Sequence, residues 1–111
     1  MTIDDLRRRI DELDERLVAL LNERAACALE IGKLKRSLGV EVYQPDREAE
    51  VLRHVRDCSD QTAGPLGAAA VARLFERIID EARRIERATA GVDAPKDDEQ
   101  ASIERAMELE D

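Results

Sequence analysis

The sequence predicts an all-α protein in which three helices form one subunit and the first helix is much the longest. Apolar residues recur at alternating spacings of three and four through the first 38 positions, the repeat of a long amphipathic helix. Helix-favouring residues such as Ala, Leu, Glu and Arg dominate, and only five glycines and three prolines interrupt the chain. A length of 111 residues allows one domain at most.

The first helix is predicted over residues 4–38. Its apolar seam runs through Ile3, Leu6, Ile10, Leu13, Leu17, Leu20, position 24, Cys27, Ile31, Leu34 and Leu38. Thr2 followed by Asp5 resembles a capping box, and Gly39 is a natural stop after the last turn. Such a helix is roughly 50 Å long, whereas a globule of about 90 residues has a radius of gyration near 12 Å. We therefore expect another copy of the chain to cover it, in a homo-oligomer with this helix at the interface.

Two shorter helices follow in the prediction. Pro45 sits where a first-turn proline belongs, which starts a helix over about 45–58. Residues 59–65 are predicted to be loop, and a third helix covers about 67–89. The side chains expected to face inward are Ala49, Val51, Leu52, Val55, Val71, Leu74, Phe75, Ile78, Ile79, Ala82 and Ile85.

Charge divides the chain into a domain over residues 1–90 and an acidic tail over 91–111, which we expect to be disordered. The tail carries −6 of the net charge of −8. A near-neutral body with an acidic tail argues against a nucleic-acid binder. No signal peptide or membrane span is visible, which predicts a cytoplasmic protein. Cys27 and Cys58 form no redox or metal motif and are expected to be buried free thiols.

The sequence offers no Gly-rich phosphate loop, no metal-ligand cluster and no Ser-His-Asp set. His54 is the only histidine and is interpreted as a surface residue. Neither a cofactor nor a metal is therefore expected.

Arg24 is the one charged residue in the apolar seam. A cation at such a position is destabilising unless an anion meets it. One interpretation is a buried Arg–Glu pair that fixes the helix register, and the other is a pocket for an acidic ligand. Lys35 favours the pocket, because eleven residues return to within about 20° of the same helix face, roughly 16 Å along the axis. Arg7 points about 100° away, so in an antiparallel dimer it could reach the partner's pocket.

Three charged residues outside the first helix also admit two interpretations. Arg47 and Glu48 lie in the first turn of the second helix, where acids complement the helix dipole but a cation is unfavourable without a partner. Glu86 continues an apolar line on the third helix, so it either faces inward or is an exposed residue near the helix end.

An ordered set of motifs resembles the all-α, AroQ-type chorismate mutases. The matching segments are Leu-Arg-x-x-Ile-Asp-x-Leu-Asp (6–14), Leu-Leu-x-x-Arg (20–24), Ile-Gly-x-x-Lys (31–35), Val-Tyr-x-Pro-x-Arg-Glu (42–48) and Leu-Phe-x-x-Ile-Ile (74–79). The resemblance covers about residues 4–90. It implies an intertwined homodimer with two equivalent pockets, and conversion of chorismate to prephenate in phenylalanine and tyrosine biosynthesis.

The resemblance also implies a role for individual residues. The implied substrate-site residues are Arg7, Arg24, Lys35, Gln44, Arg47, Glu48, Ala82 and Glu86. Arg24 and Lys35 of one subunit and Arg7 of the other would hold the two substrate carboxylates. Lys35 and Glu86 would face the ether oxygen, which makes them, with Arg24, the implied catalytic residues. A unimolecular Claisen rearrangement fits the expected absence of a nucleophile, metal or cofactor.

The far wall of the implied site departs from the family at two positions. Arg47 would line the pocket and Glu48 would meet the ring hydroxyl, but Gln44 stands where relatives often have Asp and Ala82 where some have Ser. The alternatives are therefore activity on isochorismate or aminodeoxychorismate, or a non-catalytic helical dimerisation or regulatory module. A partner enzyme from the shikimate pathway is a further possibility that the sequence leaves open.

Overall fold

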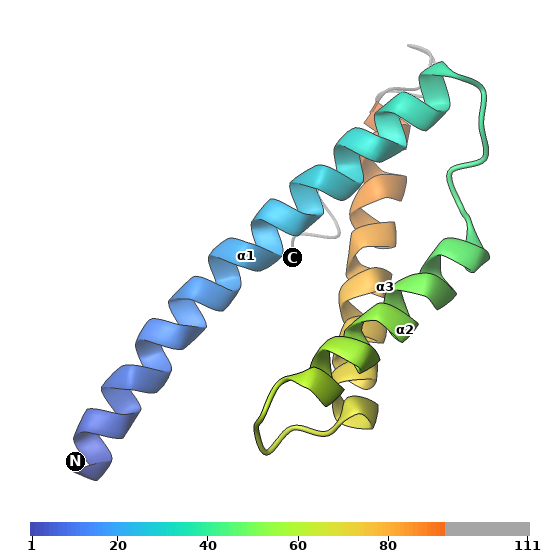
Figure 1. Cartoon of the computed structure of the whole chain (residues 1–111). Helices are drawn as coiled ribbons and strands as arrows, with labels where there is room; N and C mark the ends of the chain where they lie inside the picture. The colour runs from blue at the N-terminus through green and yellow to red at the C-terminus, as the bar shows by residue number, and fades with distance from the viewer. Residues whose placement is uncertain (93–111) are drawn as a thin grey trace.

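The computed structural model describes residues 1–92, which form three helices joined by two connections (Figure 1). These are α1 (Ile3–Ser37), α2 (Pro45–Gln61) and α3 (Ala68–Val92). Within this described part every regular element is a helix, which confirms the all-α, three-helix prediction. Of the tail expected to be disordered, residues 91 and 92 instead belong to α3, and residues 93–111 lie outside the described residues.

Local signals in the sequence set both ends of α1. The Thr2 side chain accepts a hydrogen bond from the Asp5 backbone N–H (3.1 Å), and the Asp5 carboxylate accepts one from the Thr2 N–H (3.0 Å). This reciprocal pair confirms the predicted capping box. Gly39 follows the helix with a φ of 70°, a left-handed conformation that a glycine adopts without strain.

The sequence predicted the ends of both α2 and α3 too early. The predicted ends were residues 58 and 89, whereas the helices end at Gln61 and Val92. Residues 59–61, predicted as loop, are the last turn of α2. The Thr62 hydroxyl donates to the Cys58 carbonyl (2.7 Å), which satisfies one carbonyl of this turn. The Ser59 hydroxyl donates to the Leu66 carbonyl (3.3 Å) and so ties the turn to the connection that follows. α3 continues through Gly91 to Val92, because one glycine costs a helix only about 1 kcal/mol.

The helix α3 packs against both α1 and α2, whereas the backbones of α1 and α2 stay apart from each other (Figure 1). Val55, Ala72 and Ile79 form the buried apolar core, and Gly32 is the one buried residue of α1. Three residues expected to face inward are exposed instead, namely Ala49, Leu74 and Ile85. The buried core of the single chain is small, so apolar residues at the sides of each helix's inward face remain exposed.

The N-terminal half of α1 extends away from the other helices (Figure 1). Its large apolar side chains are exposed in the single chain: Ile3, Leu6, Ile10, Leu13, Leu17, Val18, Leu20 and Leu21.

Both cysteines are free, but the expectation that they are buried is wrong for this chain, because Cys27 and Cys58 are exposed. Cys27 belongs to the same uncovered seam, so its exposure has the same origin.

Candidate active site

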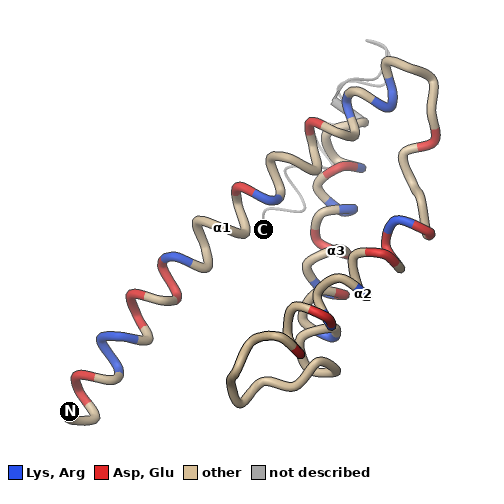
Figure 2. Tube along the Cα trace, viewed as in Figure 1, with Lys and Arg blue, Asp and Glu red and all other residues tan. Residues whose placement is uncertain are grey.

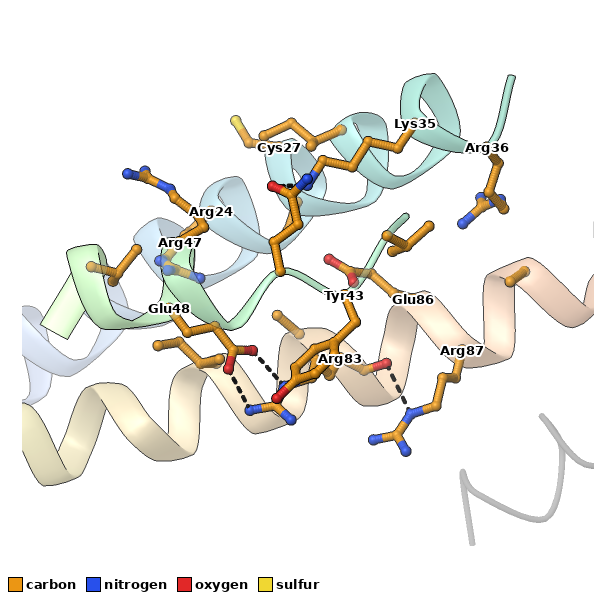
Figure 3. A pocket seen from close by; sticks show the side chains of 18 residues that line it. Arg24, Cys27, Lys35, Arg36, Tyr43, Arg47, Glu48, Arg83, Glu86 and Arg87 are labelled. Carbon is orange, nitrogen blue, oxygen red and sulfur yellow. Dashed lines mark hydrogen bonds and ion pairs between the residues drawn. The ribbon is translucent and has the colours of Figure 1, made fainter. Parts of the chain in front are cut away.

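A cavity of about 620 Å³ opens where the three helices converge (Figure 3). The C-terminal half of α1 forms one side and the C-terminal half of α3 the other, and the connection before α2 closes one end with the first turn of that helix. Apolar walls come from residues such as Ile31, Val51 and Ile79. Most of the charged side chains that line the cavity therefore stand on helices, and aliphatic side chains lie between them.

The structure brings nearly all the sequence-predicted site residues to this cavity. Those that line it are Arg24, Lys35, Gln44, Arg47, Glu48, Ala82 and Glu86. Arg7 is the exception, because it is exposed near the start of α1 and is absent from the lining. The hydrophobic walls and converging polar groups are typical of a site for a small polar molecule.

The cavity is strongly cationic although the whole chain has a net charge of −8. Its lining contains the cations Arg24, Lys35, Arg36, Arg47, Arg83 and Arg87 and the acids Glu48 and Glu86. Figure 2 shows that these charges come from all three helices rather than from one basic segment. Such a concentration of positive charge in a partly enclosed space favours an anionic ligand.

Arg24 and Lys35 occupy one wall together, as their spacing on the helix predicts. Arg24 is half-buried, and its guanidinium carbon lies 5.9 Å from the centre of the Phe75 ring. Among residues 1–92 no carboxylate forms an ion pair with Arg24, so the Arg–Glu pair considered above is not present in this part of the chain. The Lys35 ammonium donates a hydrogen bond to the Gln44 side-chain oxygen (3.2 Å).

The opposite wall contains Arg47, Glu48 and Ala82. Arg47 is exposed and forms an ion pair with Glu50 at 3.2 Å, one turn further along α2. Glu48 is paired with Arg83 of α3 through two nitrogen–oxygen contacts of 2.7 and 3.1 Å. Ala82 adds only a methyl group to the lining.

Glu86 points from α3 towards α1 and lies between the two walls (Figure 3). Burial raises the pKa of its carboxyl above the ordinary value, because the charged form loses hydration. The cations Lys35, Arg36 and Arg83 act in the opposite direction on this pKa, and the negative charge of Glu48 adds to the increase. Burial therefore favours the protonated form of the Glu86 carboxyl.

Sequence reasoning missed four charged or aromatic members of the lining, namely Arg36, Tyr43, Arg83 and Arg87. The three arginines lie on helices rich in charge, where a cation is normally solvated. Tyr43 is part of the Val-Tyr-x-Pro motif, which offered a signal, but its role there was not assigned. No local pattern identifies Arg83, because its main partner is 35 residues away in the sequence.

The described residues give little support to other kinds of site. Residues 1–92 contain no group of three His, Cys, Asp or Glu side chains placed to hold a metal ion. In the same range no helix combines the length and apolar character needed to cross a membrane. His54 is exposed, as predicted, with its Nε2 atom 3.7 Å from the Cys58 sulfur.

Comparison with known proteins supports one family. Residues 6–87 match the profile described as chorismate mutase type II. The fold superposes on a chorismate mutase (form II) from Thermus thermophilus with a TM-score of 0.69 and 31% identity, covering 76% of this chain and 92% of that one.

Longer relatives match in sequence over the same region. A bifunctional chorismate mutase/prephenate dehydratase from Neisseria gonorrhoeae is 43% identical over 90 residues, and one from Pseudomonas aeruginosa is 42% identical over 86. These matches cover 78% and 73% of this chain but only 24% and 23% of the relatives, so the chain spans about a quarter of their length. The family profile and the shared fold together show that the chain belongs to the chorismate mutase type II family.

Proposed function

We propose that this chain is an isomerase that converts chorismate to prephenate. The observation that carries the proposal is the cationic cavity, which Arg24 and Lys35 of one helix line together with Glu48 and Glu86 from the other two. Chorismate is a compact dianion, so a site lined by several cations and few acids matches its charge. The family membership of residues 6–87 supports the same reaction.

The reaction requires positioning and electrostatic stabilisation rather than a nucleophile. One carbon–oxygen bond breaks while one carbon–carbon bond forms within the same molecule, and negative charge grows on the ether oxygen. We propose that Arg24 and Lys35 hold the substrate carboxylates, so that the enolpyruvyl group stays folded over the ring. Lys35 and protonated Glu86 donate hydrogen bonds to the ether oxygen, which stabilises the transition state more than the bound substrate.

The remaining contacts of the proposed site concern the ring. Glu48 accepts a hydrogen bond from the ring hydroxyl, and Arg47 lines the same wall. Gln44 and Ala82 border this region with an amide and a methyl group. They supply no negative charge, so the choice between chorismate and close analogues depends chiefly on Glu48.

We also propose that the site is completed by a second copy of the chain in an intertwined homodimer. The exposed apolar N-terminal half of α1 needs a partner surface, and Arg7 lies on this half, outside the cavity of its own chain. A second hollow, lined mainly by apolar residues, opens between α2 and α3 at the end opposite the site. In the dimer, the partner's Arg7 reaches the substrate carboxylate that Arg24 does not hold.

A shikimate-pathway partner stays a proposal. The relatives from Neisseria gonorrhoeae and Pseudomonas aeruginosa are named as joint chorismate mutase/prephenate dehydratases. A dehydratase that consumes prephenate is therefore the chemistry expected beside this chain. A cytoplasmic location likewise stays a prediction.

Direct assay of the purified chain tests the function. Incubation with chorismate should deplete it and yield prephenate as the identified product, without added metal or cofactor. Separate incubations with isochorismate and aminodeoxychorismate test the alternative activities. A folded, dimeric sample that leaves all three compounds unchanged would support the dimerisation or regulatory module instead.

The pH dependence of turnover should report Glu86. Only the protonated carboxyl can donate to the ether oxygen, so kcat/KM should fall as the pH rises through the raised pKa of this group. Glu86→Gln donates through an amide at any pH and should therefore retain more activity at high pH than the wild type. The exposed Glu76 on the same helix provides the control Glu76→Gln, which should keep the wild-type profile. Identical profiles for wild type and Glu86→Gln would contradict this role.

A further inference from the structure

Arg83 of α3 forms an ion pair with Glu48 of α2 in the lining of the cavity. Its Nε atom lies 2.7 Å from Glu48 Oε1 and its Nη2 atom 3.1 Å from Glu48 Oε2, so the guanidinium meets both carboxylate oxygens (Figure 3). The Nη2 contact is a hydrogen bond, whereas the Nε contact is an ion-pair approach in which the buried Nε atom makes no hydrogen bond within the described residues. The two contacts together restrict where the carboxylate of Glu48 lies. The ion pair links the first turn of α2 to the middle of α3 along the wall that faces α1.

The guanidinium is itself held from two other directions. Its central carbon lies 5.3 Å from the centre of the Tyr43 ring, and its Nη2 atom lies 3.3 Å from Asp80 Oδ1. The side chains of Arg83 and Glu48 retain 37% and 23% of their full exposure, so the pair is partly buried. These contacts with Tyr43 and Asp80 limit the movement of the Arg83 guanidinium, so its pair with Glu48 holds a more constant geometry than a fully exposed ion pair.

The charges around Arg83 argue against a direct role in holding a substrate carboxylate. Two carboxylates, those of Glu48 and Asp80, already balance its positive charge. Arg24, by contrast, forms no ion pair within residues 1–92, which leaves its charge available. A substrate anion would therefore be attracted to Arg24 more than to Arg83.

We propose that Arg83 is a positioning residue that fixes the Glu48 carboxylate in the orientation needed to accept a hydrogen bond from the substrate's ring hydroxyl. This inference rests on the proposed function. Without Arg83, the Glu48 side chain can rotate about its single bonds and spread over several orientations. The substrate contact is then weakened although Glu48 itself is present.

A double-mutant cycle in kcat/KM tests this role. Arg83→Met should lower kcat/KM about tenfold, the usual scale for a weakened hydrogen bond to a charged group. Most of the loss should appear in KM, because the ring hydroxyl is not part of the reacting bonds and its contact exists before the transition state. In a Glu48→Gln background the same change should alter kcat/KM by less than about twofold, because the two effects share one interaction.

Two further variants separate positioning from simple charge or folding effects. Arg83→Lys keeps the positive charge but cannot make the forked contact, so it should not restore wild-type KM. Arg84→Met is the matched control, because Arg84 is the exposed neighbour outside the cavity lining, and it should behave as wild type. Thermal unfolding of each variant shows whether it is folded under assay conditions. If Arg83→Met is not folded, Arg83→Lys takes its place in the cycle.

The outcomes distinguish this inference from the proposed function. An inactive, folded wild type would overturn the function itself and this role with it. An active wild type in which the Arg83 substitution costs as much in the Glu48→Gln background as beside the native Glu48 would overturn only the positioning role, because Arg83 would then act independently of Glu48. Unchanged KM and kcat in Arg83→Met would also overturn it.

Discussion

Replacing Arg24 with alanine should reduce kcat/KM by a factor on the order of 10²–10³, the scale seen when one preorganised donor to a developing charge is removed. Arg24 is half-buried, lies in the cavity and forms no ion pair within the described residues. Its loss therefore removes a charge that the substrate carboxylate would otherwise meet. The substitution should leave folding intact, because an unpaired cation in an apolar seam does not stabilise the helix.

The measurement compares chorismate consumption and molecular mass for Arg24→Ala and a matched variant. Arg56→Ala is suitable, because Arg56 is exposed on α2 and lies outside the cavity lining. We expect Arg56→Ala to match the wild type and Arg24→Ala to lose turnover as an intact dimer. Unchanged turnover in Arg24→Ala would refute the assignment of the cavity as the active site.

Replacing Arg7 with alanine should have an effect of similar size, although Arg7 lies outside the cavity of its own chain. The expected cause is loss of the cation that the partner subunit supplies to each site. Arg8→Ala is the control, because Arg8 is the adjacent arginine and pairs with Asp5 on the exposed surface at 3.0 Å. Equal kcat/KM values for Arg7→Ala and Arg8→Ala would contradict the proposal that Arg7 supplies a cation to the partner's site.

Helix geometry explains why one wall of the cavity could be predicted from the sequence. Hydrogen bonding fixes 3.6 residues per turn, so residues eleven apart on an unbroken helix must share a face. Arg24 and Lys35 meet this condition, and both line the cavity. The same periodicity predicted the long seam of α1, whose apolar residues the single chain leaves exposed.

The opposite wall was reachable only through resemblance to a family. An acid in the first turn of a helix has the same appearance whether it complements the dipole or lines a site. Glu48 therefore carried no signal of its own, and the apolar line that Glu86 continues on α3 left its inward and exposed placements equally open. Both line the cavity, because the packing of α3 between α1 and α2 brings separate segments together.

Contacts between distant segments could not be predicted at all. Periodicity states which face a side chain occupies but not what it meets there, so the pairing of Arg83 with Glu48 was missed. The end of α2 was misplaced for a related reason. Residues 59–61 have loop-like composition, but they continue α2 to Gln61, and the Thr62 hydroxyl after them bonds back to the Cys58 carbonyl.

A subunit-mixing experiment tests most directly whether two chains share each site. Arg7→Ala and Arg24→Ala chains are unfolded together and refolded, so that half of the dimers contain one chain of each kind. In a mixed dimer one site has both substitutions and the other has neither, so the mixture should recover about a quarter of wild-type activity. Activity no higher than the mean of the two separate variants, with mixed dimers demonstrably present, would contradict a site shared between two chains.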